Sequence, residues 1–462
     1  MPFPTNLYNK HDAHVEMHLE KTEALLPSLG DANFPFKGKI HRPGMEEYMQ
    51  SIEKNYAYQT KYKDKMNPAL FAYPDNGELS SIESAISFGR KAGLHIMGRS
   101  GGHQYCGVSS DNGSVIIDME EWNTIGDLKD SGSLVGPELA KKYPRMVTVG
   151  VGVCLGDLAT RLGDFNCTVP MGECPSVCVG GHMQSGGWGR MNRPLGLFTE
   201  YVHGFTIVTT EGVKRVSCKS TGRELDLYNA VRGGSPGAFG IVTEATLLLL
   251  SDSNVPNSRA YGQVLPFFDH DGDDDDDDGP LAVIMEMYTN LINRIGDSEE
   301  ALSLGLEISY SVKKTPPPII SGLPGIPQAI HLIMVEATVV DDTDESSMNV
   351  FRDIMETTER AKRTKNCQRC CSRRALVHMV LKYLSPSTFK DGRKRMPFSV
   401  INKTTVRGHP FVMSRTETNP IQRLSKYPHL VACIYPKSEA QIPIDLFMNG
   451  DVEAKTNGTY ET

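Results

Sequence analysis

The sequence predicts an α+β protein with two domains. Its 462 residues are too many for one ordinary hydrophobic core. Short β-branched runs alternate with amphipathic helical runs up to about residue 252, and a second set of strand and helix patterns follows an aspartate run. We therefore expect an N-terminal extension over residues 1–65 and a first domain over residues 66–252. Residues 253–462 are expected to form a second α+β domain, an antiparallel sheet with helices.

The composition is that of a globular protein, with 39% hydrophobic and 23% charged residues. The net charge of −8 argues against a nucleic-acid partner. No apolar run reaches the roughly 18 residues of a membrane span, so no membrane partner is expected. The first ten residues lack the apolar core of a signal peptide, which favours a cytoplasmic protein but leaves the compartment open. The ten cysteines are scattered and do not predict a disulfide framework.

The first domain is predicted from local patterns. Ser80 and Glu83 form a capping-box pattern at the start of a helix, which Gly93 should end. A hairpin is expected to turn at Glu211 and Gly212. The remaining elements follow from alternating or periodic apolar residues: strands at 94–97, 114–119, 146–153 and 240–250, and a helix at 155–163.

The second domain begins with a charged loop. The run from Asp273 to Asp278 repels itself and predicts a solvated loop; a calcium site is disfavoured, because the run lacks the spacing of calcium ligands. We expect a helix at 281–300, a strand at 330–340 and a helix at 345–363. A later cysteine cluster is interpreted as part of a surface helix, in preference to a redox pair or metal half-site: Cys367, Cys370 and Cys371.

A first glycine-rich loop, Arg99 to Tyr105, follows a predicted strand. Its glycines allow backbone N–H groups to converge on a pyrophosphate without Cβ clashes. No helix pattern follows it, which argues against a Rossmann site. On the glycines alone, a plain turn is the favoured interpretation.

A second loop, Gly172 to Gly189, is denser still in glycine and places Cys174 beside a proline. Its last ten residues hold five glycines, which is costly in chain entropy unless the backbone must approach a ligand closely. A flat ring system is a natural ligand for such a surface. A metal cluster of Cys174, Cys178 and His182 is disfavoured, because no second ligand pair lies nearby.

The order of the motifs RSGGHQY, GECPSVCVGGHMQSGGWG, RPLGL and NAVRGGSPGAFGIVTE resembles the berberine bridge enzyme-like FAD-linked oxidoreductases over roughly residues 70–250. These are flavoproteins of the vanillyl-alcohol-oxidase and p-cresol methylhydroxylase type. The resemblance implies a first domain that binds FAD and a second that binds substrate. It also implies two covalent bonds to the flavin, from His103 to the 8-methyl carbon and from Cys174 to ring carbon 6. Both side chains are nucleophiles that can add to an electron-poor ring.

The resemblance carries further roles residue by residue. Val177 matches the position that controls oxygen access, where valine is typical of oxidases; ordinary packing is the alternative. Gly172, which opens the loop that carries Cys174, is expected beside the flavin. The residues expected around the pyrophosphate are Arg99, Ser100, Gly101, Gly102, Gln104 and Tyr105. Those expected near the flavin ring or ribityl chain are Gly180, Gly181, His182 and Gly187, with Gly240 and Val242 on the closing strand.

The implied activity is hydride transfer from a small organic substrate, such as an alcohol, a sugar or a secondary metabolite, to FAD and then to O₂, giving H₂O₂. A flavin-binding protein without catalysis and a dehydrogenase that excludes oxygen are the alternatives. No catalytic base is assigned: the family's C-terminal segment with its Tyr or Glu base is not found, and Tyr310 is better explained as a core residue. Pro236 and Trp188 depart from the family pattern. The oligomeric state is left open.

Overall fold

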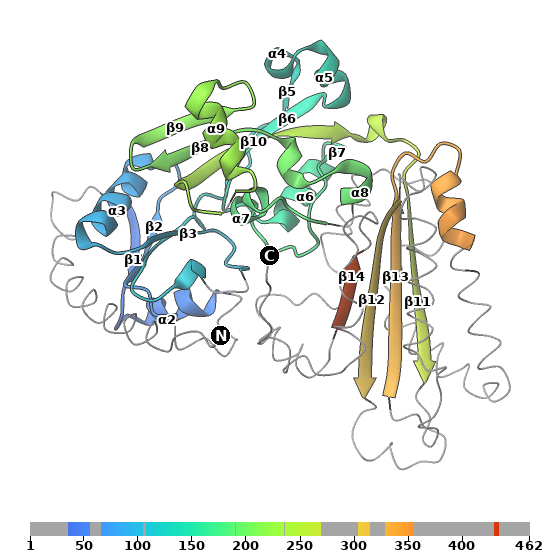
Figure 1. Cartoon of the computed structure of the whole chain (residues 1–462), viewed down its shortest axis with the longest axis horizontal. Helices are drawn as coiled ribbons and strands as arrows, with labels where there is room; N and C mark the ends of the chain where they lie inside the picture. The colour runs from blue at the N-terminus through green and yellow to red at the C-terminus, as the bar shows by residue number, and fades with distance from the viewer. Residues whose placement is uncertain are drawn as a thin grey trace, which may run out of the picture. The chain divides into compact units, whose positions relative to one another are not determined.

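The computed structural model describes the chain in several stretches and divides it into two compact units (Figure 1). Within the described part, the first unit ends at Arg259 and the second begins at Ala260. The described residues are 36–55, 66–104, 108–189, 191–234, 236–268, 304–314, 329–353, 356 and 429–433.

A small, mostly parallel sheet opens the first unit, with strands in the order β1-β2-β4-β3. Strands β2 and β3 both run parallel to β4, whereas β1 is antiparallel to β2. Parallel strands of one sheet need a crossover connection, and α3 supplies it between β2 and β3, which lie on either side of β4. The bounds are β1 Gly38–His41, α2 Glu46–Glu53, β2 Leu70–Pro74, α3 Leu79–Ala92, β3 Ile96–Arg99 and β4 Val115–Asp118.

Helix α3 ends as predicted but starts differently. Its C-cap is Gly93, whose φ of 69° lies in the left-handed region that favours glycine. The predicted capping box is wrong, because the N-cap is Glu78 and no side chain caps the helix. Since the helix already begins at Leu79, Ser80 lies inside the first turn, past the capping position. The apolar side chains that drive its packing are buried: Ile82, Ala85, Ile86 and Phe88.

A second, antiparallel sheet is built around β10, in the order β5-β6-β10-β8-β9, with β7 also paired to β10. The hairpin between β8 and β9 is confirmed, but Thr209 pairs with Gly212, so the turn consists of Thr210 and Glu211. The strands are β5 Lys129–Asp130, β6 Arg145–Gly150, β7 Cys167–Thr168, β8 Val202–Thr209, β9 Gly212–Ser217 and β10 Ile241–Ser251.

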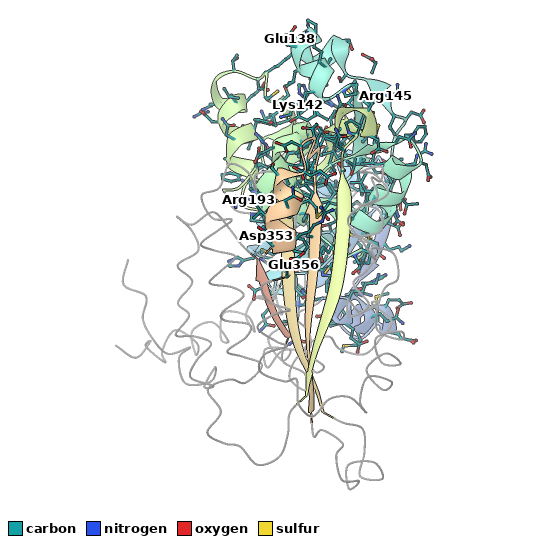
Figure 2. The ribbon with its side chains drawn as sticks, turned by 90° about the vertical axis from the view of Figure 1, so that its right-hand side faces the viewer. Glu138, Lys142, Arg145, Arg193, Asp353 and Glu356 are labelled. Carbon is teal, nitrogen blue, oxygen red and sulfur yellow. The ribbon has the colours of Figure 1, made fainter. Side chains whose placement is uncertain are left out.

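Short helices join these strands, and α6 has the predicted bounds, Leu155–Gly163. Glu138 and Lys142 extend from α5 into solvent (Figure 2). One hydrophobic cluster contains side chains of both sheets, among them Ile117 of the first and Leu247 of the second, so the first unit has a common core. The other helices are α4 Gly132–Val135, α5 Pro137–Lys142, α7 Val179–Gln184, α8 Asn192–Leu195 and α9 Gly222–Val231.

The second unit contains a four-stranded sheet in the order β11-β13-β12-β14, and β12 is antiparallel to both of its neighbours. The predicted strand at 330–340 corresponds to β13, and the predicted helix after it is seen at 346–353. Tyr310 lies on β12, opposite Ile333 and Leu430. The expected helix at 281–300, the aspartate run and the cluster at 367–371 lie outside the described residues. The bounds are β11 Arg259–Phe268, β12 Leu304–Lys314, β13 Ala329–Val339 and β14 His429–Cys433.

None of the helices that the structure describes is both long and apolar enough to span a bilayer.

A buried ion pair joins β3 to β4. The Nε of Arg99 donates to the carboxylate of Asp118 at 2.5 Å, and both side chains are almost fully inaccessible to solvent. The guanidinium also donates to the carbonyl of Ser51, at 2.7 Å, and to the hydroxyl of Tyr73, at 3.0 Å, and it lies over the ring of Phe71. Burial raises the pKa of the Asp118 carboxyl, and the positive charge of Arg99 opposes that rise.

Replacing Arg99 with alanine is expected to lower the free energy of unfolding of the first unit by about 3–5 kcal/mol, because Asp118 would be left as a buried charge without its counter-ion. Urea titration followed by tryptophan fluorescence measures the change. Lys37→Ala is the matched control, since it removes the exposed ion pair with Glu78 and should leave stability nearly unchanged. Equal effects of the two substitutions would contradict this account.

Candidate functional site

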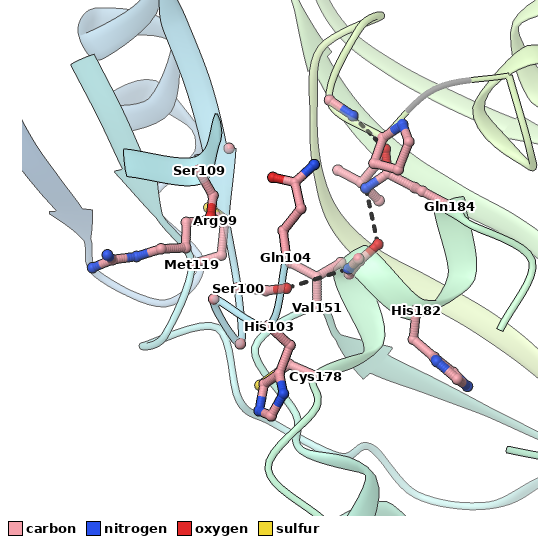
Figure 3. Close-up of a pocket in the computed structure, with 18 of the residues that line it drawn as sticks. Arg99, Ser100, His103, Gln104, Ser109, Met119, Val151, Cys178, His182 and Gln184 are labelled. Atoms are coloured by element: carbon pink, nitrogen blue, oxygen red, sulfur yellow. Dashed lines mark hydrogen bonds between the residues drawn. The ribbon is translucent and has the colours of Figure 1, made fainter. Parts of the chain in front are cut away.

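A cavity of about 290 Å³ lies in the first unit, where the two glycine-rich loops meet (Figure 3). Three segments line most of it: the end of β3 with the loop after it, the second loop with α7, and the turn that leads into β10. Its volume is near the lower end of the range for small-molecule sites. Of the predicted site residues, those that line the cavity are Arg99, Ser100, Gly101, Gly102, His103, Gln104, Val177, Gly180, Gly181, His182, Gly240 and Val242.

The first loop lines one side of the cavity. The guanidinium of Arg99 is held in the buried network with Asp118, and Figure 3 shows this side chain pointing away from His103 and Gln104. The backbone of Arg99 can therefore contact a ligand, while its guanidinium stabilises the start of the loop through the ion pair with Asp118. Ser100 instead faces the second loop, where its hydroxyl accepts a hydrogen bond of 3.3 Å from the N–H of Gly181. Tyr105 lies outside the described residues.

The two loops touch so closely that glycine is required at the contact. A Cβ added to Gly101 would lie 2.8 Å from the backbone nitrogen of Cys178. A Cβ added to Gly180 would lie 3.0 Å from the hydroxyl oxygen of Ser100. Gly181 differs, because nothing lies within 4 Å of the position of its Cβ. Its glycine thus leaves space for a ligand rather than for a neighbouring loop.

His103 is held by the second loop. Its Nε2 lies 2.9 Å from the hydroxyl oxygen of Ser176, a hydrogen bond whose direction depends on the tautomer of the ring. Ser176 is only two residues from Cys174, which is half-buried and does not line the cavity. The hydrogen bond therefore brings the imidazole next to the segment that carries the predicted thiol.

His182 is a buried, neutral histidine. Its Nε2 accepts a hydrogen bond of 3.2 Å from the N–H of Gly172, so its Nδ1 carries the proton. Burial lowers the pKa of His182 to about 4. The ring packs edge-on against Phe198, and a Cβ at Gly187 would lie only 2.4 Å from the Cβ of Phe198. Gly172 and Gly187 do not line the cavity; they pack around His182 instead.

The turn before β10 closes the cavity. Gly240 has a φ of 145°, and a Cβ there would lie 2.5 Å from the carbonyl oxygen of Val208, so only glycine fits. The side chain of Gln184 ties this turn to α7: its amide donates to the carbonyl of Gly180, at 2.9 Å, and its carbonyl accepts from the N–H of Gly237, at 3.1 Å.

Sequence reasoning missed several residues that line the cavity. Gln184 and Cys178 stand inside the second loop motif, so their position could have identified them. Pro236 was noticed only as a departure from the family pattern. No local signal points to Ser109, which the fold brings to the cavity from a neighbouring 3₁₀ turn. The other missed residues are Met97, Gly98, Met119, Val151, Ser185, Gly237 and Ile241.

The lining suits a ligand with an anionic part and a flat part. Among the residues that line this cavity there is no Asp or Glu, so no carboxylate repels an anion. Hydroxyl and amide side chains offer hydrogen bonds, and the glycines give access to the backbone. Apolar side chains complete the wall: Met97, Met119, Val151, Val177, Ile241 and Val242. No group of three or more possible metal ligands occurs within the part of the chain that the structure describes.

Gly101→Ala is expected to lower the free energy of unfolding by about 1–3 kcal/mol, because the new methyl group would push against the backbone of Cys178. Gly181→Ala is the matched control, since its Cβ meets open space, and it should leave stability unchanged or raise it slightly. Thermal unfolding of both variants measures the difference. A Gly101→Ala protein as stable as the parent would show that the loops are not in contact.

Stability should depend on pH through His182. Below pH 6.5 the unfolded chain binds a proton at this ring that the folded protein, with a pKa of about 4, does not bind. The contribution is therefore complete above pH 6.5 and is lost as the pH falls toward 4, by up to about 3 kcal/mol. Unfolding at pH 6.5 and 4.5 should show a smaller loss for His182→Gln than for the parent. Identical losses would show that this histidine is not buried.

Comparison with known proteins identifies a domain in the first unit. Residues 68–217 match the family model described as an FAD binding domain. The chain is 33% identical over 183 residues to the FAD-linked oxidoreductase pynB of Aspergillus niger, an alignment that covers 40% of this chain and 31% of that protein. It is 28% identical over 286 residues to berberine bridge enzyme-like 18 of Arabidopsis thaliana. That alignment covers 58% of this chain and 50% of the relative. The chain thus spans half or less of these relatives.

Solved structures support the fold. A variant of BBE-like 1 from Physcomitrella patens superposes with a TM-score of 0.51 at 20% identity, covering 74% of this chain and 59% of that one. 6-Hydroxy-D-nicotine oxidase from Arthrobacter nicotinovorans superposes with a TM-score of 0.51 at 20% identity, covering 69% of this chain and 59% of that one. The predicted α+β fold class is confirmed, and so is the FAD binding domain within it. The chain therefore contains an FAD binding domain and is similar to the FAD-linked oxidoreductases named berberine bridge enzyme-like.

Proposed function

We propose that this chain belongs to an FAD-dependent oxidoreductase that holds its flavin through two covalent bonds, one from His103 and one from Cys174. The observation that carries the proposal is the cavity between the two glycine-rich loops, with His103 on its wall and Cys174 two residues from the serine that binds this histidine. The cavity lies in the part of the chain that contains the FAD binding domain.

The donor set fits FAD. A pyrophosphate needs hydrogen-bond donors and no opposing carboxylate, and the first loop offers backbone N–H groups beside Ser100 and Gln104. A three-ring system needs flat, apolar walls, and Val151, Val177 and Ile241 line the same cavity. The open space at Gly181 accommodates part of such a ligand, where a side chain would fill it.

Ser176 acts as a positioning residue for His103. Its hydroxyl fixes the Nε2 side of the imidazole and so sets the direction of the opposite ring nitrogen, Nδ1. A nucleophile that is held in one orientation adds to an electrophilic carbon more readily than one that rotates. The thiol of Cys174 is the second nucleophile, and its attack requires the thiolate.

When bound, FAD supplies an electron-poor ring that accepts a hydride from substrate and passes the electrons to O₂, with H₂O₂ as the product. The protein orients a small organic substrate, such as an alcohol, a sugar or a secondary metabolite, against that ring. Val177, half-buried on the cavity wall, is proposed to leave space for O₂. No described residue is assigned as the base that takes the substrate proton.

Covalent attachment is tested by acid precipitation of the purified holoprotein. The yellow colour should remain in the pellet for the parent, for His103→Ala and for Cys174→Ala, because each single variant keeps one bond. The double variant should release its flavin into the supernatant. Ser176→Ala, combined with Cys174→Ala, should retain several-fold less flavin than Cys174→Ala alone, because the imidazole would no longer be oriented.

Cys218→Ser is the control for these variants. Cys218 directly follows β9, is exposed to solvent and does not line the cavity. Flavin that stays bound after acid treatment of the double variant would overturn the assignment of the two tethers. Flavin that is lost from the parent itself would overturn covalent binding altogether.

Oxidase activity is tested separately. Stopped-flow mixing of the reduced protein with O₂ should show rapid reoxidation, and Val177→Leu should slow it at least several-fold, because the larger side chain would occupy the space assigned to O₂. Slow reoxidation by the parent would identify a dehydrogenase instead. A protein that binds flavin, but produces no H₂O₂ with any alcohol, sugar or secondary metabolite tested, would support the non-catalytic alternative.

A further inference from the structure

Two cysteines face each other at the cavity wall. Cys154 follows β6 and precedes α6, while Cys178 precedes α7, and the two form an isolated antiparallel bridge. Their Sγ atoms lie 3.1 Å apart. The hydrogen bonds on either side run from Leu155 N–H to Val177 carbonyl, at 2.8 Å, and from Val179 N–H to Val153 carbonyl, at 2.9 Å. The two cysteines therefore face each other at a position between two backbone hydrogen bonds.

This type of pair is suited to a disulfide. Residues that face each other without backbone hydrogen bonds have Cα atoms about 4.5 Å apart, which lies within the range of disulfide-bonded cysteines, about 4.4–6.8 Å. The sulfur atoms need to approach by only about 1 Å to reach bonding distance. The bond can thus form with little movement of the backbone.

The pair also lies at the junction of the two loops. Cys178 lines the cavity, and a Cβ on Gly101 would lie 3.2 Å from its sulfur. Both thiols approach the carbonyl oxygen of Ser176, at 3.8 Å for Cys154 and 3.7 Å for Cys178. The hydroxyl of the same serine binds His103. A change at this pair therefore acts on the residues that hold the imidazole.

We propose that Cys154 and Cys178 form a reversible disulfide that controls how firmly the second loop is held against the first. The oxidant is a low-molecular-weight disulfide of the glutathione class. The thiolate of Cys154, the more exposed of the two, attacks one sulfur of that disulfide and releases one small thiol. The thiolate of Cys178 then attacks the sulfur of Cys154 and releases the second small thiol.

The reaction is balanced, because the protein loses two electrons and two protons and the small disulfide gains both as two thiols. The new bond connects positions 24 residues apart, which restricts the unfolded chain. It also fixes the start of α7 to the start of α6. The proposal does not depend on bound FAD, so its outcome can be separated from that of the proposed function.

Peptide mapping tests the proposal on the full-length protein. Cleavage by trypsin after Arg145, Arg161 and Arg190 places Cys154 in peptide 146–161 and Cys178 in peptide 162–190. After treatment with oxidised glutathione, we expect most of the protein to yield these two peptides as one linked species. Dithiothreitol should separate them. Fragmentation should locate the bond at Cys178, and not at Cys167 or Cys174, which share its peptide.

Substitutions provide the controls. Cys154→Ser and Cys178→Ser should each abolish the linked species, whereas Cys167→Ser, in β7, should leave it unchanged. In the parent, oxidation should slow hydrogen exchange at the amides of Leu155 and Val179 and raise the midpoint of thermal unfolding. Stable glutathione adducts without a linked species, or a bond to another cysteine, would overturn the proposal. If hydrogen exchange stayed unchanged after complete linkage, the disulfide would not control how firmly the second loop is held.

Discussion

The site depends on the close contact between two glycine-rich loops from different sheets. The first loop continues from β3 of the small parallel sheet, and the second leads from β7 of the antiparallel sheet into α7. Gly101 lies against the backbone of Cys178, and Ser100 binds the N–H of Gly181. Only residues without a Cβ can be this close. The contact creates the cavity, because it brings His103 and the segment from Cys174 to Val177 to the same place.

Each loop is held from behind by buried polar groups. The ion pair between Arg99 and Asp118 fixes the end of β3, at the point where the first loop begins. On the other side, the neutral ring of His182 accepts a hydrogen bond from Gly172 and so joins the beginning of the second loop to α7. Burial of such groups is costly unless they are hydrogen-bonded. Here Arg99 donates to Asp118, and His182 accepts from Gly172. The cavity wall is thus rigid where a cofactor must be placed accurately.

Local patterns in the sequence were enough to predict much of the fold. The end of α3 at Gly93, the bounds of α6 and the central strand β10 follow from periodicity and from glycine chemistry. The predicted start of α3 was wrong, because Ser80 and Glu83 have the spacing of a capping box but lie two residues too far into the helix, whose N-cap is Glu78. Patterns of this kind predict an element more reliably than its first residue.

The site was predictable only in part, for a physical reason. The motifs identified the two loops, but not which atoms each residue presents. Arg99 was expected beside the pyrophosphate; it lines the cavity, and its guanidinium is held in the core by Asp118. Gly172 and Gly187 were expected beside the flavin, and they pack around His182. Ser176, Gln184 and the pair of Cys154 and Cys178 owe their significance to contacts across 24 to 73 residues of chain, which no local pattern contains.

Both loops are proposed to hold one flavin. A tryptic digest of the holoprotein, with its disulfides reduced, tests this most directly. Cleavage after Arg99 and Lys129 isolates His103 in peptide 100–129, and Cys174 lies in peptide 162–190. The expected result is a single species that absorbs at flavin wavelengths and has the mass of both peptides and one FAD, less the hydrogens lost in forming the two bonds. Flavin found on neither peptide, or on one peptide alone in a fully loaded protein, would contradict it.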